Sequence, residues 1–464
     1  MNDIAAAQDR KLERRGFYRM TLRLTLPIVL QNLMDSAVNA ADVVMLSFVS
    51  QTALSASSLA GQVQFVLSMI FYGLSGGAAV MCSQYWGKGD TRTIEKVMAI
   101  AIRMTIVISL AFALAAWLAP AWLMRIFTAD EALIDAGCQY LRAIGAAYVF
   151  NGFCSIYLCS MRSVERVVMS AAVHGAAVAL NVLLNACFIF GLGFFPELGI
   201  VGVALATSIT RAIELVVCVI DSRLCRRVRL RIGDFFARYA ALTRDFLKYA
   251  LPSMANDMIW GMAFTMYSVI LGHLSSDVVA ANSLNATVRS LATVVCFGCS
   301  SSAAIILGKA MGDNRLEDAR RYAGRLARLS AYTAIVGGLI ILATRPLLLQ
   351  LTGSGYFKLS DEARGYFSIM LFISSYYALG QSVNTMLICG IYRAGGDVKF
   401  GLFTDLFSMW AYAVPIGFFS AFVLKLPPMW VYFILCLDEF VKMPVIIRHY
   451  FKFTWLKNIT RDDV

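Results

Sequence analysis

Long apolar runs recur along the whole chain and constrain its fold more than any other feature. A helix that crosses a bilayer needs about twenty predominantly apolar residues. Windows of this kind lie at roughly 22–48, 56–84, 94–120, 134–160, 168–192, 198–222, 250–273, 279–308, 330–352, 366–391, 401–423 and 428–450. Only 15% of the residues are charged, whereas soluble proteins carry about 25%. The sequence therefore predicts an all-α integral membrane protein with about twelve transmembrane helices.

Basic residues are distributed unevenly between the predicted loops. With the N-terminus placed inside, most of the 41 Lys and Arg residues fall in the inside segments. Cytoplasmic loops carry such an excess, so we expect both termini in the cytoplasm and a multi-pass protein of the bacterial plasma (inner) membrane. The net charge of +12 then reflects topology. No basic stripe on an aromatic soluble segment indicates nucleic-acid binding.

The second half of the chain repeats the first at a constant offset. Pro27 aligns with Pro252, and the offset of 225 residues continues without a gap through the following helix pair. Six predicted spans per half give both copies the same membrane orientation. We therefore expect two pseudo-symmetric six-helix bundles, at residues 1–225 and 226–464. Parallel repeats occur in transporters that bind substrate between the halves and alternate access by rocking.

The first predicted helix carries two carboxylates inside an apolar run. Asp35 and Asp42 are seven residues apart, which places them on nearly the same helix face. An ionised group at this depth costs roughly 3 kcal/mol unless it meets water or a partner. Both are therefore candidate functional residues, and a polar patch between packed helices is the alternative. In the repeat, Tyr267 replaces Asp42 and Trp260 replaces Asp35, so we expect ion coupling in the first half.

Further polar residues within the spans could line a substrate cavity. Asp257 is either a cavity charge that meets cationic substrates or an interhelical hydrogen-bond partner. Arg289 either pairs with a carboxylate across the cavity or snorkels outward. Together with Gln31 and Asp35, these two residues make up the predicted substrate cavity.

Several stretches resemble recurring segments of the multidrug and toxic compound extrusion (MATE) family over nearly the whole chain. They are Leu26-Pro27 followed fifteen residues later by Asp42, Ser83-Gln-Tyr-Trp-Gly87-Lys-Gly-Asp90, Leu180-Asn181-Val-Leu-Leu-Asn185, Pro196 to Thr207, Leu251-Pro252 before Asn256-Asp257, and Tyr392-Arg393-Ala-Gly-Gly396-Asp397. The resemblance implies two six-helix bundles arranged as a V. It also implies a secondary active antiporter for multidrug efflux, which exports organic, often cationic or amphipathic, xenobiotic compounds in exchange for sodium ions or protons.

The resemblance further implies an ion-coupling site in the N-terminal bundle. By position, its residues are Asp42, Asn181, Tyr140 and Thr207. Hard cations prefer oxygen ligands, so Asp42 and Asn181 are the expected ligands if the coupling ion is sodium. Where some family members carry a second carboxylate, this chain has Asn185, whose amide carbonyl can still bind a cation. A proton carried by Asp42 is the alternative.

A flippase for a lipid-linked oligosaccharide or cell-wall precursor is the alternative transporter function. A pyrophosphate cavity would be rich in arginine, whereas three carboxylates accompany Arg289 at similar depth, which favours cations. No nucleophile–base pair or metal cluster indicates an enzyme, and no G-x-x-x-x-G-K-[ST] run indicates direct use of ATP. The expected partners are a small organic substrate and the lipid bilayer, with no nucleic acid and no cofactor beyond the coupling ion. A monomer is the expectation from the resemblance.

Overall fold

Helices form every regular element of the described structure. The computed structural model describes residues 2–47, 50–191, 195–225, 227–353 and 360–462. Each predicted apolar window coincides with a helical segment of this part of the chain, so the predicted all-α membrane fold is confirmed. Eight of the described helices are long and apolar enough, taken singly, to cross a membrane.

The chain divides into two compact units, which are described separately. Unit 1 comprises Met1–Val29 and Ala255–Ile459, and unit 2 comprises Leu30–Met254 and Thr460–Val464. The long helices α1 (Asn2–Ser47) and α9 (Ala240–Gly272) therefore each contribute to both units. The boundary expected between residues 225 and 226 falls inside unit 2, because the beginning of α9 packs there.

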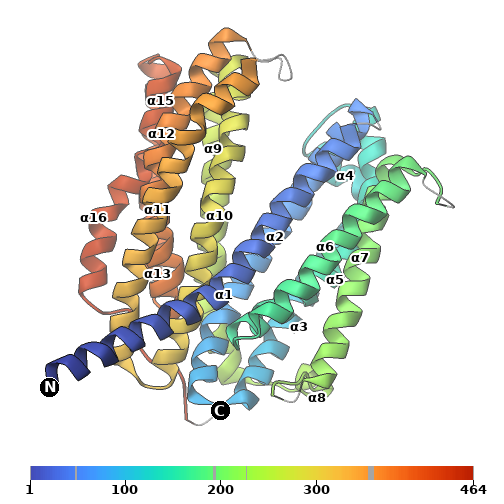
Figure 1. The fold of residues 1–464 in the computed structure, drawn as a ribbon. Helices are drawn as coiled ribbons and strands as arrows, with labels where there is room; N and C mark the ends of the chain where they lie inside the picture. Colours follow the sequence, from blue (N-terminus) through green and yellow to red (C-terminus); the bar gives the residue numbers. More distant parts are fainter. Residues whose placement is uncertain (1, 48–49, 192–194, 226, 354–359, 463–464) are drawn as a thin grey trace. The chain divides into compact units, whose positions relative to one another are not determined.

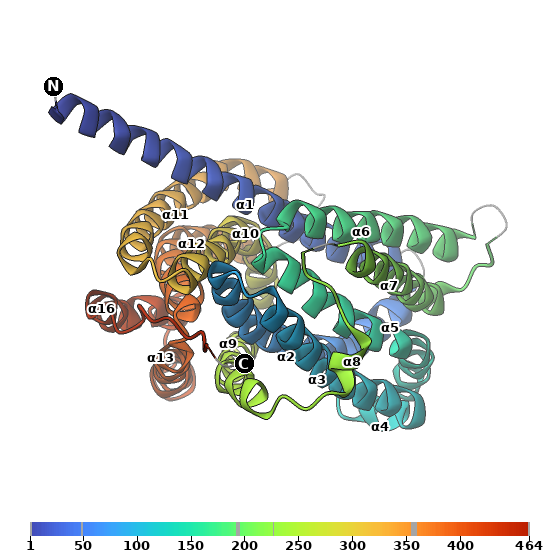
Figure 2. The same ribbon diagram turned by 90° about the horizontal axis from the view of Figure 1, so that it is seen from below.

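Unit 2 is built around α5. Besides parts of α1 and α9, the helices of this unit are α2 (Gln51–Lys88), α3 (Thr91–Leu118), α4 (Pro120–Arg125), α5 (Glu131–Ser163), α6 (Val167–Phe190), α7 (Gly199–Leu224) and α8 (Ile232–Phe236). Helix α5 packs against α2, α3 and α7, and α7 packs against α6 (Figure 1). The short helix α8 packs against α3 (Figure 2). Helices α6 and α7 thus lie next to each other, where polar side chains from both can meet.

Two glycines on α2 explain why the beginning of α9 belongs to unit 2. Gly73 and Gly77 lie one turn apart on the same face. A Cβ atom on Gly73 would lie 2.1 Å from the Cα of Met254, and one on Gly77 would lie 2.6 Å from the Cα of Ala250. Small residues at this spacing let the backbones of membrane helices approach closely. The contact therefore attaches the first half of α9 to α2.

Unit 1 contains the rest of the helices. They are α10 (Ser276–Gly312), α11 (Leu316–Gly353), α12 (Asp361–Thr385), η1 (Met386–Tyr392), α13 (Val398–Asp405), η2 (Leu406–Ala413), α14 (Val414–Phe418), η3 (Phe419–Val423), α15 (Pro428–Leu435) and α16 (Asp438–Phe451). The π-helical segments η2 and η3 flank Pro415, which has no N–H for the regular hydrogen-bond ladder. Helices α15 and α16 together fill the last predicted window, with a break at Cys436 and Leu437.

Large apolar side chains are exposed along the long helices. Examples are Val107 on α3, which is 64% exposed, and Leu339 on α11, which is 59% exposed. Water-soluble proteins rarely expose contiguous apolar surface of this extent. Contact with lipid accounts for these side chains, in agreement with the predicted membrane fold.

Candidate functional site

Three helices of unit 2 each place polar side chains at two levels. Within each pair the residues are seven positions apart: Asp35 and Asp42 on α1, His174 and Asn181 on α6, and Thr207 and Glu214 on α7. Seven residues are about two helical turns, so the members of a pair share a helix face and lie about 10 Å apart along it. The structure joins these residues into two separate hydrogen-bonded networks.

The first network, here called the Asp42 network, consists of Asp42, Asn181, Asn185 and Thr207. The amide nitrogen of Asn185 donates to Asp42 Oδ1 at 2.6 Å and to Asn181 Oδ1 at 3.3 Å. Asn181 in turn donates to the hydroxyl of Thr207 at 3.3 Å, and that hydroxyl donates to the carbonyl of Val203 at 3.0 Å. The Asn185 nitrogen therefore donates to two oxygens, and the Asp42 carboxylate receives the shortest of these hydrogen bonds.

Burial leaves one strong acceptor of this network unused. Asn185 is fully buried, and its Oδ1 accepts no hydrogen bond from the described residues. Its nitrogen already faces two oxygens, so the amide orientation is fixed by its neighbours. Tyr140, on α5, is buried and close enough to Asp42 to interact electrostatically, but no hydrogen bond joins it to the Asp42 network in the described part of the chain. Four of the five predicted ion-coupling residues thus form one network, with the fifth nearby.

The second network, here called the His174 network, consists of Asp35, His174, Arg211 and Glu214. His174 Nε2 lies 2.7 Å from Asp35 Oδ1, and His174 Nδ1 lies 3.0 Å from Glu214 Oε1. Arg211 donates to the other oxygen of Glu214 at 2.6 Å. The Asp35 side chain is 43% exposed, whereas that of Glu214 is inaccessible. The network therefore runs from the accessible carboxylate of Asp35 to the buried carboxylate of Glu214, which Arg211 pairs.

Sequence reasoning found only Asp35 of this network. His174 has no ligand spacing with another histidine, and a single histidine in an apolar helix gives no signal by itself. The available signal was the shared interval of seven residues on three helices, combined with Arg211 and Glu214 three positions apart. Only the packing of α6 against α7 shows that the residues at these intervals lie side by side in the structure.

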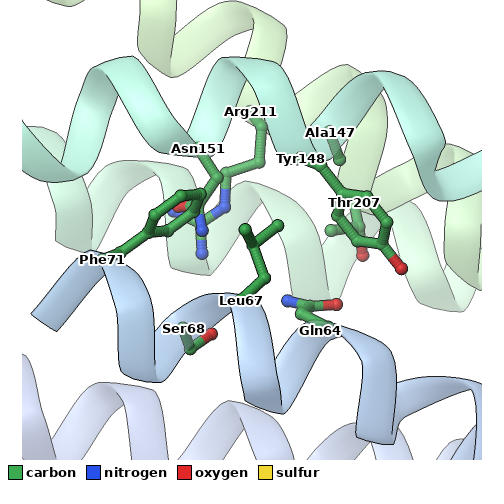
Figure 3. Close-up of a pocket in the computed structure, with 9 residues that line it drawn as sticks. All are labelled: Gln64, Leu67, Ser68, Phe71, Ala147, Tyr148, Asn151, Thr207 and Arg211. Carbon is green, nitrogen blue, oxygen red and sulfur yellow. The ribbon is translucent and has the colours of Figure 1, made fainter. Parts of the chain in front are cut away.

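The two networks border the same small pocket of unit 2. Its lining comes from α2, α5 and α7: Gln64, Leu67, Ser68, Phe71, Ala147, Tyr148, Asn151, Thr207 and Arg211. Thr207 belongs to the Asp42 network and Arg211 to the His174 network, one turn apart on α7, and both appear at this pocket in Figure 3. Helix α7 therefore presents both networks to one space.

Gln31 is buried beside Asp35 and already has a partner. The Arg162 guanidinium of α5 donates to Gln31 Oε1 at 3.2 Å, and the Gln31 side chain lies one turn before Asp35 on α1. Gln31 therefore links α1 to α5. Of the two predicted cavity residues in unit 2, Asp35 is the accessible one.

The two predicted cavity residues of unit 1 have different environments. Asp257 forms an ion pair with Arg393 at 3.2 Å, so the structure shows it as an interhelical partner. Arg289 follows neither expected alternative. Its guanidinium lies over the rings of Phe264 and Tyr377, 5.1 and 5.3 Å from their centroids, without a hydrogen bond or ion pair to any described residue. Two aromatic rings therefore lie against this cation, and no described carboxylate pairs with it directly.

Unit 1 also contains a buried charged cluster that sequence reasoning missed. Lys442 of α16 pairs with Asp405 at 2.8 Å and with Glu439 at 3.1 Å. Tyr267, which takes the place of Asp42 in the repeat, donates to Asp438 at 3.1 Å. Unit 1 therefore gathers carboxylates from α13 and α16, and Lys442 of α16 balances part of their charge. In the described residues, no group of three or more His, Cys, Asp or Glu side chains could hold a metal ion.

Comparisons with known proteins agree with this architecture. The MatE family model matches residues 27–187 and 252–419, two stretches that begin at the prolines of the repeat. The uncharacterized transporter YisQ of Bacillus subtilis is 22% identical over 437 residues, which are 94% of each chain. The probable multidrug resistance protein NorM of Mesorhizobium japonicum is 25% identical over 418 residues, which are 87% of each chain.

A solved structure provides the corresponding comparison of folds. The outward-facing conformation of a multidrug resistance MATE family transporter of the MOP superfamily aligns with a TM-score of 0.85 and 16% identity, over 94% of this chain and 96% of that one. At this identity the likeness shows the fold. The family model, in contrast, matches most of the chain. The chain therefore belongs to the MatE family of multi-pass membrane transporters.

Proposed function

We propose that this MatE transporter is a secondary active antiporter that exports a cationic or amphipathic organic molecule in exchange for sodium ions or protons. The Asp42 network is the proposed coupling-ion site. The supporting observation is the Asn185 side chain, which is buried, bonded to Asp42 through its nitrogen, and left with an unused oxygen beside the carboxylate.

A sodium ion would use the oxygen atoms of this network. The Asp42 carboxylate, the amide oxygens of Asn181 and Asn185, and the hydroxyl of Thr207 form the oxygen-rich donor set that a hard cation prefers. In the present arrangement the Asn185 nitrogen occupies the position beside Asp42. A bound cation would therefore require the Asn185 amide to rotate, so that its oxygen replaces its nitrogen at this position.

A proton on Asp42 would find an acceptor in the same amide without rotation. One carboxylate oxygen now accepts a hydrogen bond from Asn185, and a protonated carboxyl adds an O–H donor while its other oxygen remains an acceptor. The unused Asn185 Oδ1 would then accept from this O–H. Either coupling ion would therefore change the contacts of the Asn185 amide, and through Asn185 it would act on α6.

Asp35 is the strongest candidate contact for a cationic substrate in unit 2, because it is the accessible carboxylate of that unit's networks. Exchange further requires that ion and substrate favour different states of the transporter, since a ligand shifts an equilibrium only by its differential affinity. In unit 1, Asp257 is balanced by Arg393, so it contributes less negative potential than its depth suggested.

Arg289 is the observation that favours the alternative flippase function. Its guanidinium carries five N–H donors and lies in a pocket of unit 1 beside Asn282 and Ser268, with no carboxylate as a direct partner among the described residues. Such a group could bind the phosphate of a lipid-linked precursor. A pyrophosphate site would need several basic side chains, and this pocket contains one arginine, so the antiporter is the preferred function.

Transport by the purified protein in liposomes tests the proposal. Tetraphenylphosphonium, a monovalent organic cation, serves as the substrate, and a sodium gradient and a proton gradient are imposed in separate experiments. We expect one of the two gradients to drive its transport. Asp42→Asn should abolish this transport while the protein remains folded and inserted. Asp361→Asn, at the fully exposed start of α12, is the matched control and should transport normally.

The possible results separate the alternatives. Drive by sodium alone assigns the Asp42 network to a metal ion, and drive by protons alone assigns it to protonation. Full transport by Asp42→Asn would contradict the proposed site. If neither gradient drives wild-type transport, binding of a pyrophosphate lipid by wild type and by Arg289→Gln would test the flippase function.

A further inference from the structure

The two contacts of the His174 ring call for one proton more than a neutral ring and two ionised carboxylates supply. Both ring nitrogens of His174 face carboxylate oxygens at hydrogen-bond distance, 2.7 Å to Asp35 and 3.0 Å to Glu214. A neutral imidazole has one N–H and one lone pair. If both carboxylates were ionised and the ring neutral, one of these contacts would set lone pair against lone pair. Both contacts can be hydrogen bonds only when the network holds one additional proton.

The charges around His174 balance only when this proton is present. Asp35 faces the ring from α1, and Glu214 faces it from α7. Arg211 pairs with Glu214 on α7. With an imidazolium ring, two positive and two negative groups meet in the network. Without the proton, a net negative charge remains on partly buried groups, which is costly away from water.

The other ionisable groups near the network do not change this balance. On α5, Arg162 is engaged with Gln31 one turn away from Asp35, and Cys154 places a thiol, not a further carboxylate, near Glu214. Where α1 meets α6, Met34 lies against Gly175, next to His174 in the chain. Asp35 and Glu214 are therefore the carboxylates that determine the charge of His174.

We propose that Asp35, His174 and Glu214 form a second proton-binding site, separate from Asp42, at which the cationic group of a substrate replaces the proton. This inference rests on the proposed antiport function and adds which residue gives up a proton when the substrate binds. When a monovalent organic cation binds beside Asp35, it compensates the carboxylate charge that had stabilised the imidazolium. His174 then releases one proton to water, so one positive charge arrives as another leaves.

The exposure of the three residues gives this exchange a direction. The Asp35 side chain is 43% exposed, that of His174 is 11% exposed, and that of Glu214 is inaccessible. A substrate therefore reaches Asp35 first, while Glu214 stays paired with Arg211 and His174 in every state. Glu214 and Arg211 are positioning residues in this scheme: they hold the ring so that its Nε2–H points to Asp35.

The chain is well suited to a direct test, because it contains only three histidines, His174, His273 and His449. We would label the histidine rings of the full-length protein with ¹⁵N and record spectra in liposomes at about pH 7, where a histidine of unperturbed pKa is largely neutral. Loss of a signal in His174→Gln assigns it, and His273→Gln, an exposed histidine bonded to the carbonyl of Val269, is the control. We expect both His174 nitrogens to carry protons without ligand, and one to lose its proton in saturating tetraphenylphosphonium.

Several results would overturn the inference. A neutral His174 ring in the ligand-free protein would contradict the second proton site, and an imidazolium that persists in saturating tetraphenylphosphonium would contradict the exchange. Asp35→Asn gives a further check, because removal of one carboxylate should leave His174 neutral even without ligand. Both measurements follow the ring itself and do not require the His174 variant to be active.

Proton release separates this inference from the proposed function. In weakly buffered solution, we expect His174→Gln to release about one proton fewer than wild type per bound tetraphenylphosphonium, and the exposed control Asp361→Asn to release as much as wild type. Equal release by wild type and His174→Gln would overturn the inference while leaving antiport intact. If wild type neither binds nor transports the cation, the proposed substrate class fails, and the ligand-free spectrum still decides whether the site holds its proton.

Discussion

At the scale of single residues, Asn185 distinguishes this chain from family members that carry a second carboxylate at the corresponding position. Its side-chain nitrogen donates a hydrogen bond to the Asp42 carboxylate at 2.6 Å. A carboxylate at this position would set two like charges against each other, and two carboxylates in contact do not both stay ionised without a proton or a cation between them. The identity of this side chain therefore controls how strongly the site attracts an ion.

Asn185→Asp should increase the affinity of the site for sodium. The added charge lies in direct contact with Asp42, and we expect an increase of at least about tenfold, which corresponds to ~1.4 kcal/mol. The measurement is the dependence of the thermal unfolding temperature on sodium concentration, with choline as the substitute cation. Asp361→Asn serves as the control for a change of charge on the surface. An unchanged sodium dependence would show that residue 185 is not part of a cation site.

At the scale of helices, the close approach of α2 and α9 depends on the glycine pair on α2. Gly73→Ala should destabilise the protein, because its Cβ would overlap the backbone of Met254, and overpacking of this kind costs about 1–3 kcal/mol. Gly61→Ala on the same helix is the matched control, since no atom lies within 4 Å of the position of its Cβ. Thermal unfolding in detergent would compare them, and equal stability of the two variants would contradict the proposed role of the glycine.

The link from α3 to α8 should make stability depend on pH. Asp234 accepts hydrogen bonds from Arg92 at 2.5 and 2.6 Å and from Tyr239 at 2.8 Å. Burial opposes ionisation of this carboxyl, but the hydrogen bonds from Arg92 and Tyr239 outweigh it and hold the pKa of Asp234 below its ordinary value. The ionised form therefore favours folding above the ordinary carboxyl pKa, and this stabilisation is lost as the pH falls through the lower pKa of the folded state.

Asp234→Asn tests this link. We expect the variant to be less stable than wild type at neutral pH and to lose less stability than wild type when the pH is lowered to about 3, because the carboxyl that titrates is gone. Thermal unfolding as a function of pH gives both quantities, and Asp361→Asn controls for the loss of an exposed carboxylate. Parallel curves for wild type and Asp234→Asn would exclude a contribution from this ion pair.

At the scale of the whole molecule, the distribution of Lys and Arg predicts the orientation in the membrane. Because cytoplasmic loops carry the basic excess, we expect protease to remove a C-terminal epitope tag from inside-out membrane vesicles and to leave it intact on spheroplasts. An N-terminal tag should behave in the same way, since an even number of spans returns the chain to the same side. Cleavage on intact spheroplasts would reverse the predicted topology.

Much of this molecule was determined by its sequence alone. Apolar windows of span length predict the helices because a bilayer leaves no other way to satisfy the backbone hydrogen bonds. The constant offset between Pro27 and Pro252 predicts the repeat, and the interval of seven residues between Asp35 and Asp42 predicts a polar face on α1. These features are local periodicities, which a single helix already contains.

Only the tertiary structure decided which polar faces meet. Asp35 and His174 are 139 residues apart, and no local pattern shows that His174 lies between Asp35 and Glu214. The aromatic enclosure of Arg289 and the position of α9 in unit 2 are likewise results of packing between distant segments. The physical reason is the same in each case: helix periodicity fixes the face on which a side chain lies, whereas its partner depends on the rotation and depth at which another helix packs.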